Sequence, residues 1–496
     1  MNEPKKAQLC SSDLNRPGSG DSSHGYWGSI QALAPPPAWK RADTLRLIAL
    51  LALALVARLG LLIAHWDRPD WFLQPDSGIY IGLAENLAQS FGYGPHLIRP
   101  PGYPLLLVIW IKLGGSASPG WLALASLFCG LGVVAVVYLL ARRILRQRGA
   151  TMVAALVALF PNQIFYSVQV LTEMPFTLGL LLSLLFLLRY FQTSRGWDLL
   201  AASAFTAMAL LIKPLAGPLA LLFAVALLAV GPRMRLPRRH VLLYLLLPVI
   251  AYAGWSARNA AAAGRFLYSS SGRFNLLFVT AAKAKARTEE ISLQQSQQRL
   301  TREIEQTVGR SHRGLYDDVE FIDRYPAVSA KTLIENVGGL PSVWTFSLAE
   351  FAAGTATGKF LDPSRLSTGE NDGDPLERPG DLAILQFIRH RLANLRGVEP
   401  AWLRWTLGAG KLAEILLLLV VIMASAWAAI RIALRQPSIP GWLLILTAAY
   451  FTIAINLMGM GYARMRLPIE PLLFILAATQ IERRRKSTDS PKEKDS

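Results

Sequence analysis

The sequence predicts an all-α protein that crosses a membrane many times, and its composition is the first reason. Of its 496 residues, 52% are hydrophobic and only 17% are charged, and the mean hydropathy is +0.34. Apolar runs rich in Leu and Ala also recur along the chain, and many approach the roughly 20 residues that a membrane-spanning helix needs. The length would allow about three soluble domains, but this composition is that of a polytopic membrane protein.

Ten apolar runs are predicted to span the bilayer. They are residues 45–65, 121–141, 151–169, 175–190, 199–212, 215–230, 241–257, 409–430, 441–458 and 467–481. Clusters of Lys and Arg lie between alternate runs, which is the arrangement that the positive-inside rule describes. The rule therefore predicts that both termini are cytoplasmic, in an inner or plasma membrane.

Two further apolar segments are predicted to lie outside the set of spans. Residues 105–113 are too short to cross, and counting them as a span would move the next basic loop to the outer side. Residues 333–353 contain two Glu, a Gly pair and a Pro, and counting them would break the alternation downstream. The first is predicted to be a helix in the outer interface, and the second to be interfacial or packed on the soluble part.

The expected organisation follows from these spans. The long segment after the seventh span is predicted to be extracytoplasmic and mostly helical, with a helix at residues 287–309 and a loop at residues 355–380. The predicted parts are a disordered cytoplasmic tail (1–42), an N-terminal transmembrane catalytic module (43–262) with a first outer loop (66–120), the extracytoplasmic segment (263–406), C-terminal transmembrane helices (407–482) and a basic cytoplasmic tail (483–496).

The net charge of 51 − 33 = +18 does not indicate a nucleic-acid partner, because the basic residues are the membrane-flanking clusters. Cys10 and Cys129 form neither a disulfide framework nor a metal cluster, and the His residues are scattered without ligand spacing. No metal site or other cofactor is predicted. The first outer loop has no Asp-x-Asp pattern, which argues against an obligatory divalent metal and leaves metal dependence open.

Polar residues suited to chemistry gather on the predicted outer face, where five separate loops carry them. The stretch of residues 66–104 is central, because it places Asp76 and Arg99 just outside the membrane. The other candidates are Tyr80, Glu173, Lys213, Arg258, Asn259, Arg464 and Arg466. Charge from five loops at one membrane face indicates a site that acts on a substrate held in the membrane surface.

The motifs that carry these residues resemble a known family. They are Asp-x-x-x-Tyr from Asp76, then RPPGYPLL, FPNQIFYSVQVLTEMPF, LIKPLAGPL, WSARN and YARMRLPIEP. Their order and topology resemble the integral-membrane C-type (GT-C) glycosyltransferases, which use a polyprenyl-phosphate sugar as donor. The resemblance covers about residues 45–481. It is strongest to the bacterial branch with the lipid A aminoarabinose transferases and relatives of the protein O-mannosyltransferases (families 39 and 83).

The resemblance implies a GT-C fold and roles for individual residues. Asp76 and Glu173 are the predicted catalytic residues: Asp76 matches the acidic residue proposed to receive the acceptor's proton, and Glu173 matches an acidic position at the start of the fourth span. Arg99 matches a basic residue that contacts the donor phosphate, which is a lysine in the aminoarabinose branch. Members that modify protein usually have Asp-Glu in the first loop, whereas Ser77 follows Asp76 here, so a protein acceptor is disfavoured.

Each candidate also has a plainer interpretation. Asp76 could cap the helix that Ser77 begins, and Glu173 could favour a helix dipole. Arg99 could extend its side chain to the interface, as could Lys213, Arg258, Arg464 and Arg466. Tyr80 is either an interfacial aromatic or a substrate contact, and Asn259 is grouped with the substrate-binding residues.

The predicted function is transfer of a sugar from a polyprenyl-phosphate donor to an envelope acceptor, which could be a lipid, a glycan or a protein. Such a transfer needs a base near the attacking hydroxyl and positive charge at the leaving phosphate. Asp76 and Arg99 are the residues expected to supply them. The alternative is a transporter or flippase of a lipid-linked or anionic solute, which should show internal repeats and charges near span centres; the sequence shows no convincing repeat.

Overall fold

The computed structural model describes residues 38–90, 92–232, 236–311, 318–360, 401–435 and 437–488, and all regular structure in these ranges is helical. The predicted all-α class is therefore confirmed. Most of the predicted N-terminal tail, the loop beyond residue 360 and the end of the basic C-terminal tail lie outside the described residues.

Ten helices correspond to the runs predicted to cross the membrane. They are α1 (Arg41–Ala64), α4 (Pro119–Arg142), α5 (Gln147–Leu159), α7 (Glu173–Thr193), α8 (Gly196–Ile212), α9 (Ala216–Val230), α10 (Arg239–Ala263), α19 (Ala401–Leu434), α20 (Ile439–Leu457) and α22 (Glu470–Thr488). Within the described ranges, six of them (α1, α4, α7, α10, α19 and α20) are long and apolar enough to span a bilayer. The total of ten spans stays a prediction.

The third predicted span differs from the expected single helix. Helix α5 ends at Leu159, and Pro161 begins the short α6 (Pro161–Tyr166), after which the chain is irregular up to α7. Proline lacks an N–H donor and disfavours a helical conformation at the preceding residue, so the break falls at Phe160. The fully buried Arg58 of α1 donates to Ala158 O at 2.9 Å, and so satisfies a carbonyl that the break leaves without a helical partner.

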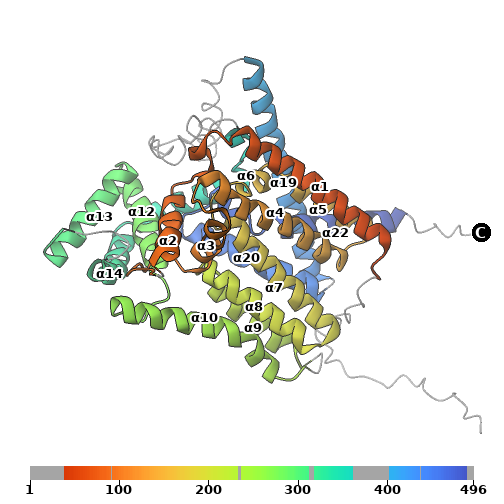
Figure 1. Cartoon of the computed structure of the whole chain (residues 1–496), viewed down its shortest axis with the longest axis horizontal. Coiled ribbons are helices and arrows are strands. Elements are labelled where there is room, and N and C mark those ends of the chain that lie inside the picture. Colours follow the sequence, from red (N-terminus) through yellow and green to blue (C-terminus); the bar gives the residue numbers. More distant parts are fainter. Residues whose placement is uncertain are drawn as a thin grey trace, which may run out of the picture.

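A second group of helices lies at one end of the bundle. Between α10 and α19 the chain forms α11 (Ser271–Asn275), η3 (Leu276–Ala281), α12 (Ala282–Thr288), α13 (Leu293–Val308), α14 (Val319–Glu335), η4 (Val337–Gly339), α15 (Leu340–Ala353) and η5 (Thr357–Phe360). Figure 1 shows α12, α13 and α14 together beside α2. The predicted helix at residues 287–309 is confirmed as the end of α12 and α13, and its Leu300 and Ile304 are fully buried in a small core of this group.

The two apolar segments excluded from the spans are both helical. The first is α3 (Gly102–Gly114), which packs on α2 (Ser77–Ser90). The second is α15, whose Phe346 and Phe351 are buried and which contacts α12 as well as α19, α20 and α21 (Ala463–Arg466). Helix α15 lies so close to the segment before α21 that Gly461 must be a glycine. A Cβ at Gly461 would lie 1.7 Å from Ser347 O of α15.

Candidate functional site

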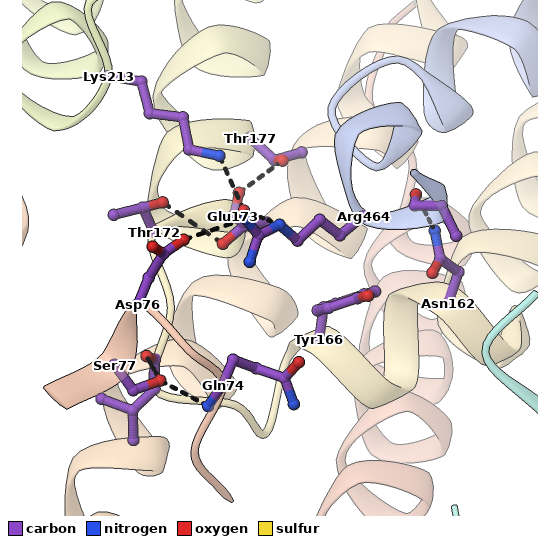
Figure 2. A network of polar contacts seen from close by, with 12 residues as sticks. Gln74, Asp76, Ser77, Asn162, Tyr166, Thr172, Glu173, Thr177, Lys213 and Arg464 are labelled. Carbon is purple, nitrogen blue, oxygen red and sulfur yellow. Dashed lines mark hydrogen bonds and ion pairs between the residues drawn. The ribbon is translucent and has the colours of Figure 1, made fainter. Parts of the chain in front are cut away.

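Five of the predicted site residues converge from five separate parts of the chain. Asp76 directly precedes α2, Arg99 lies in the turn before α3, and Glu173 is the first residue of α7. Lys213 follows the last residue of α8, and Arg464 lies in α21. Figure 2 shows Asp76, Glu173, Lys213 and Arg464 pointing toward one another. We call these five residues the Asp76 cluster.

A backbone junction holds Asp76 at this point. The Ser77 hydroxyl donates to Val170 O at 2.8 Å and accepts from the Gln74 amide at 2.8 Å. The Val170 amide in turn donates to Phe72 O at 3.0 Å. These bonds join the segment before α2 to the segment before α7, so Asp76 and Glu173 are brought to the same place.

Ion pairs link the five side chains into one network. Asp76 Oδ1 lies 2.6 Å from Arg99 Nη2, and its Oδ2 lies 3.0 Å from Arg464 Nη2. Glu173 Oε1 lies 2.9 Å from Lys213 Nζ and 3.8 Å from Arg464 Nε. Arg464 therefore bridges the two carboxylates. Both oxygens of Asp76 face arginines, and among the described residues no amide of α2 donates to them, so the helix-capping interpretation is not supported.

The Asp76 cluster carries a surplus of positive charge, because three cations surround two carboxylates. Burial would raise the pKa of Asp76, but Arg99, Arg464 and Lys213 together lower it below the usual value. Asp76 is thus a carboxylate at neutral pH. The Asp76 side chain is 26% exposed and that of Arg99 is 21% exposed, whereas that of Glu173 is only 3% exposed. The cluster is therefore open on the Asp76 side and closed around Glu173.

Two threonines, Thr172 just before α7 and Thr177 within it, form hydrogen bonds with Glu173. The Thr172 hydroxyl lies 3.4 Å from Glu173 Oε2, and the Thr177 hydroxyl donates to Glu173 O at 2.7 Å. Tyr80 supports the other end of the cluster, because the Arg99 guanidinium lies 5.3 Å from its ring centroid. Burial raises the pKa of Tyr80, so it is a neutral phenol and contacts Arg99 through its ring.

Arg258 lies outside the Asp76 cluster and holds the loop that precedes Arg99. Its guanidinium donates to His96 O at 3.4 Å and also to Gly94 O. It lies 5.1 Å from the ring centroid of Tyr93, whose hydroxyl donates to Arg99 O at 3.0 Å. Arg258 thus acts on the position of Arg99 through this loop.

Asn259, like Arg258, lies outside the Asp76 cluster. Its side-chain amide donates to Leu267 O at 2.7 Å and to Tyr268 O at 3.2 Å, and it accepts from Arg258 Nη1 at 2.9 Å. Asn259, in the last turns of α10, therefore holds the segment that follows this helix.

Arg466 belongs to a different, fully enclosed network. Its Nε lies 3.0 Å from Glu470 Oε1, its Nη2 donates to Gly354 O at 2.8 Å, and both side chains are 0% exposed. Asn162 and Gln163 of α6 donate to the two Glu470 oxygens at 2.6 and 2.9 Å. We call Arg466, Glu470, Asn162 and Gln163 the Arg466 cluster.

Three polar residues near the Asp76 cluster were missed by the sequence analysis. Gln74 lies on the turn that carries Asp76, Tyr166 is the last residue of α6, and Gln169 lies between α6 and α7. Figure 2 shows Tyr166 between Gln74 and Arg464 in this view. The available signal was the motif FPNQIFYSVQVLTEMPF, in which Gln and Tyr interrupt an apolar run, but the sequence did not show which of them face the site.

A metal site is not apparent in the described part of the chain, where no three His, Cys, Asp or Glu side chains are grouped as ligands. The carboxylates of the Asp76 cluster are instead engaged by cations of the protein.

One protein family matches part of this chain. Residues 98–256 match the family described as dolichyl-phosphate-mannose-protein mannosyltransferase. This stretch includes Arg99, Glu173 and Lys213. No curated protein matches the sequence.

Two solved structures align with most of this chain. The oligosaccharyltransferase of Archaeoglobus fulgidus, in the apo form, aligns with a TM-score of 0.50 and 14% identity over 90% of this chain and 52% of its own. ArnT from Cupriavidus metallidurans, bound to undecaprenyl phosphate, aligns with a TM-score of 0.37 and 14% identity over 91% of this chain and 80% of its own. This chain spans about half the length of the oligosaccharyltransferase. The GT-C fold expected from the sequence motifs is confirmed.

Proposed function

We propose that this membrane glycosyltransferase of the C type moves a sugar from a polyprenyl-phosphate donor to a hydroxyl of an envelope acceptor. The reaction would take place at the outer face of the inner or plasma membrane, with both termini in the cytoplasm. The observation that carries the proposal is the sharing of Asp76 between two arginines, Arg99 and Arg464, at the open side of the cluster. One site thus holds a carboxylate base and two phosphate-binding groups.

The charge of the site favours an anionic ligand. With three cations and two carboxylates, the Asp76 cluster has a net charge of +1. A donor phosphodiester carries a charge of −1, so its binding would neutralise the site. Arginine is suited to this role, because its planar guanidinium can donate to two phosphate oxygens at once. The same cations would stabilise the extra negative charge that appears on the phosphate as it leaves.

The reaction balances with the donor, the acceptor and Asp76. The acceptor oxygen forms a bond to the anomeric carbon, the bond from that carbon to the phosphate oxygen breaks, and the lipid phosphate leaves as a monoester. The acceptor proton passes to Asp76. In the free protein Asp76 is a weak base, since its two arginines lower its pKa. A bound donor phosphate would compete for Arg99 and Arg464, and the pKa of Asp76 would then rise.

Glu173 would act through its neighbours. It is buried and touches Lys213 and Arg464. Its negative charge allows two cations to lie together beside the donor phosphate, so we assign it a positioning role. The acceptor, whether lipid, glycan or protein, would approach from the exposed side of Asp76.

The test is donor cleavage by the full chain in nanodiscs with a labelled polyprenyl-phosphate sugar. Asp76→Asn should lower release of polyprenyl phosphate by about 10²- to 10⁴-fold, which is the usual contribution of a general base. The matched control is Asp70→Asn, since Asp70 is exposed outside the cluster. Unchanged turnover in Asp76→Asn would refute the mechanism. Movement of intact donor across the membrane without cleavage would instead favour the transporter class.

A further inference from the structure

Two glutamines form a side-chain pair at the turn that carries Asp76. Gln74 lies on the same turn as Asp76, and Gln169 lies on the segment that the Ser77 and Val170 bonds join to that turn. Gln74 Nε2 donates to Gln169 Oε1 at 2.9 Å. Neither residue takes part in the Asp76 cluster, so the proposed reaction leaves this pair without a role.

The neighbouring carbonyl fixes the orientation of both amides. Gln74 Nε2 also donates to Leu73 O at 3.2 Å, which requires the nitrogen on that side of the Gln74 amide. Gln169 must then present its oxygen to Gln74. This arrangement leaves Gln169 Nε2 as a donor and Gln74 Oε1 as an acceptor, and neither atom has a protein partner among the described residues.

The burial of Gln169 makes its open donor informative. The residue is 0% exposed, and its Nε2 is a buried atom that meets no acceptor in the described part of the chain. Buried polar groups in proteins are nearly always hydrogen-bonded, so an open one indicates a ligand or an ordered water molecule. Leaving such a group without a partner is unfavourable. A ligand that reaches it would therefore be bound with specificity.

We propose that Gln74 and Gln169 bind hydroxyl groups of the donor sugar and determine which sugar is accepted. This inference rests on the proposed function. A hydroxyl both donates and accepts, so neighbouring sugar hydroxyls match a side-by-side amide acceptor and amide donor. If the donor phosphate lies on Arg99 and Arg464 with the anomeric carbon facing Asp76, the sugar ring is beside the turn of Gln74. Tyr166 lies near the same place and offers an aromatic surface (Figure 2).

The experiment compares binding of undecaprenyl phosphate with binding of the same lipid carrying mannose, glucose or galactose, using the full chain in nanodiscs. The quantity measured is the sugar gain, defined as the Kd of undecaprenyl phosphate divided by the Kd of the preferred sugar-linked lipid. Gln169→Met should lower the sugar gain about tenfold, because hydrogen bonds to a buried amide are lost. Gln74→Met should lower it as well, and the Kd of undecaprenyl phosphate itself should not change in either variant.

The matched control is Gln297→Met. Gln297 lies on α13 and donates to Phe278 O at 2.8 Å, so it carries the same substitution at a satisfied glutamine outside the site. An unchanged sugar gain in both variants would overturn the inference. The partner of Gln169 Nε2 would then be a water molecule. A wild type that prefers none of the three sugars, or a loss confined to acceptor KM, would also overturn the inference. Failure of the proposed function is read separately, from the Kd of undecaprenyl phosphate in Arg464→Gln.

Discussion

Arg464 and Arg466 lie two residues apart in the short helix α21, yet they belong to opposite kinds of environment. Arg464 reaches the partly exposed Asp76 cluster, where it bridges Asp76 and Glu173. Arg466 is fully enclosed, and pairs with Glu470 and two backbone carbonyls. In a helix, positions two apart point roughly 200° from one another, so Arg464 and Arg466 face different parts of the protein.

The two clusters differ in how completely their charges are balanced. In the Arg466 cluster one cation meets one carboxylate. Asn162 and Gln163 also donate hydrogen bonds to the two oxygens of Glu470. In the Asp76 cluster three cations meet two carboxylates, and the side chains of Asp76 and Arg99 are partly exposed. A balanced and desolvated cluster contributes to structure. A cluster with surplus charge at an open face is ready to receive an anion.

The balanced cluster also supports the open one. Arg466 donates to Phe351 O and Gly354 O at the end of α15, and Asn162 of α6 donates to Ala463 O at 3.0 Å. These contacts hold α21 between α15 and α6. The position of Arg464 against Asp76 therefore depends on the Arg466 cluster, although no residue is shared between them.

The largest expected effect comes from breaking the balanced cluster. Arg466→Leu should destabilise the protein by about 3–5 kcal/mol, because it leaves the buried Glu470 without its counter-ion. The readout is thermal unfolding of the full chain in detergent. The double variant Arg466→Leu with Glu470→Leu should recover much of the loss, since both charges are then absent. A single variant as stable as the wild type would contradict a structural role for Arg466.

Breaking the open cluster should affect binding and turnover with little effect on stability. Arg464→Gln should weaken undecaprenyl phosphate binding and slow donor cleavage, with a loss in turnover of about 10²-fold, by analogy with the removal of one preorganised donor. Arg464→Lys should recover only part of this, since an ammonium cannot donate to two oxygens in a planar fork. If Arg464→Gln lowered the melting temperature as much as Arg466→Leu, the distinction between the clusters would fail.

The smallest expected effect is a pH dependence of the melting temperature that arises from Asp76. Its pKa is lowered in the folded protein, so its contribution is fully present at neutral pH and is lost as the pH falls through the lowered value. The melting temperature of Asp76→Asn should therefore lie below that of the wild type at pH 7. The gap should begin to close as the pH falls below the ordinary aspartate value of about 4. Asp70→Asn is the control, and it should show no such pH-dependent gap, because Asp70 is exposed and outside the cluster.

Much of the site was predictable because its residues flank apolar runs in a fixed order. Asp76, Arg99, Glu173, Lys213 and Arg464 were all placed at one membrane face from the alternation of spans, and the structure brings these five together. Arg258, Asn259 and Arg466 were grouped with them, since they also follow or precede spans. Their structural contacts lie elsewhere, and only packing separates the two groups.

Other features needed the tertiary structure because they depend on contacts between distant parts of the chain. In the sequence, Arg58 is a charged residue inside an apolar run. In the structure it donates to the carbonyl of Ala158, which the helix break at Pro161 leaves without a helical partner. The Gln74–Gln169 pair joins residues 95 positions apart. A pattern of residue types cannot show which of several polar side chains meet, or which donor is left open.

By itself the sequence determined the class of the protein, since hydropathy, helical periodicity and the positions of charges relative to apolar runs are local properties. It also predicted which residues supply a base and phosphate-binding groups. Only the tertiary structure decided which charges pair with one another, and therefore which cluster is balanced and which has surplus charge. The physical reason is that Coulomb energy and desolvation depend on distance and burial, and both arise when α6, α7, α15 and α21 pack together.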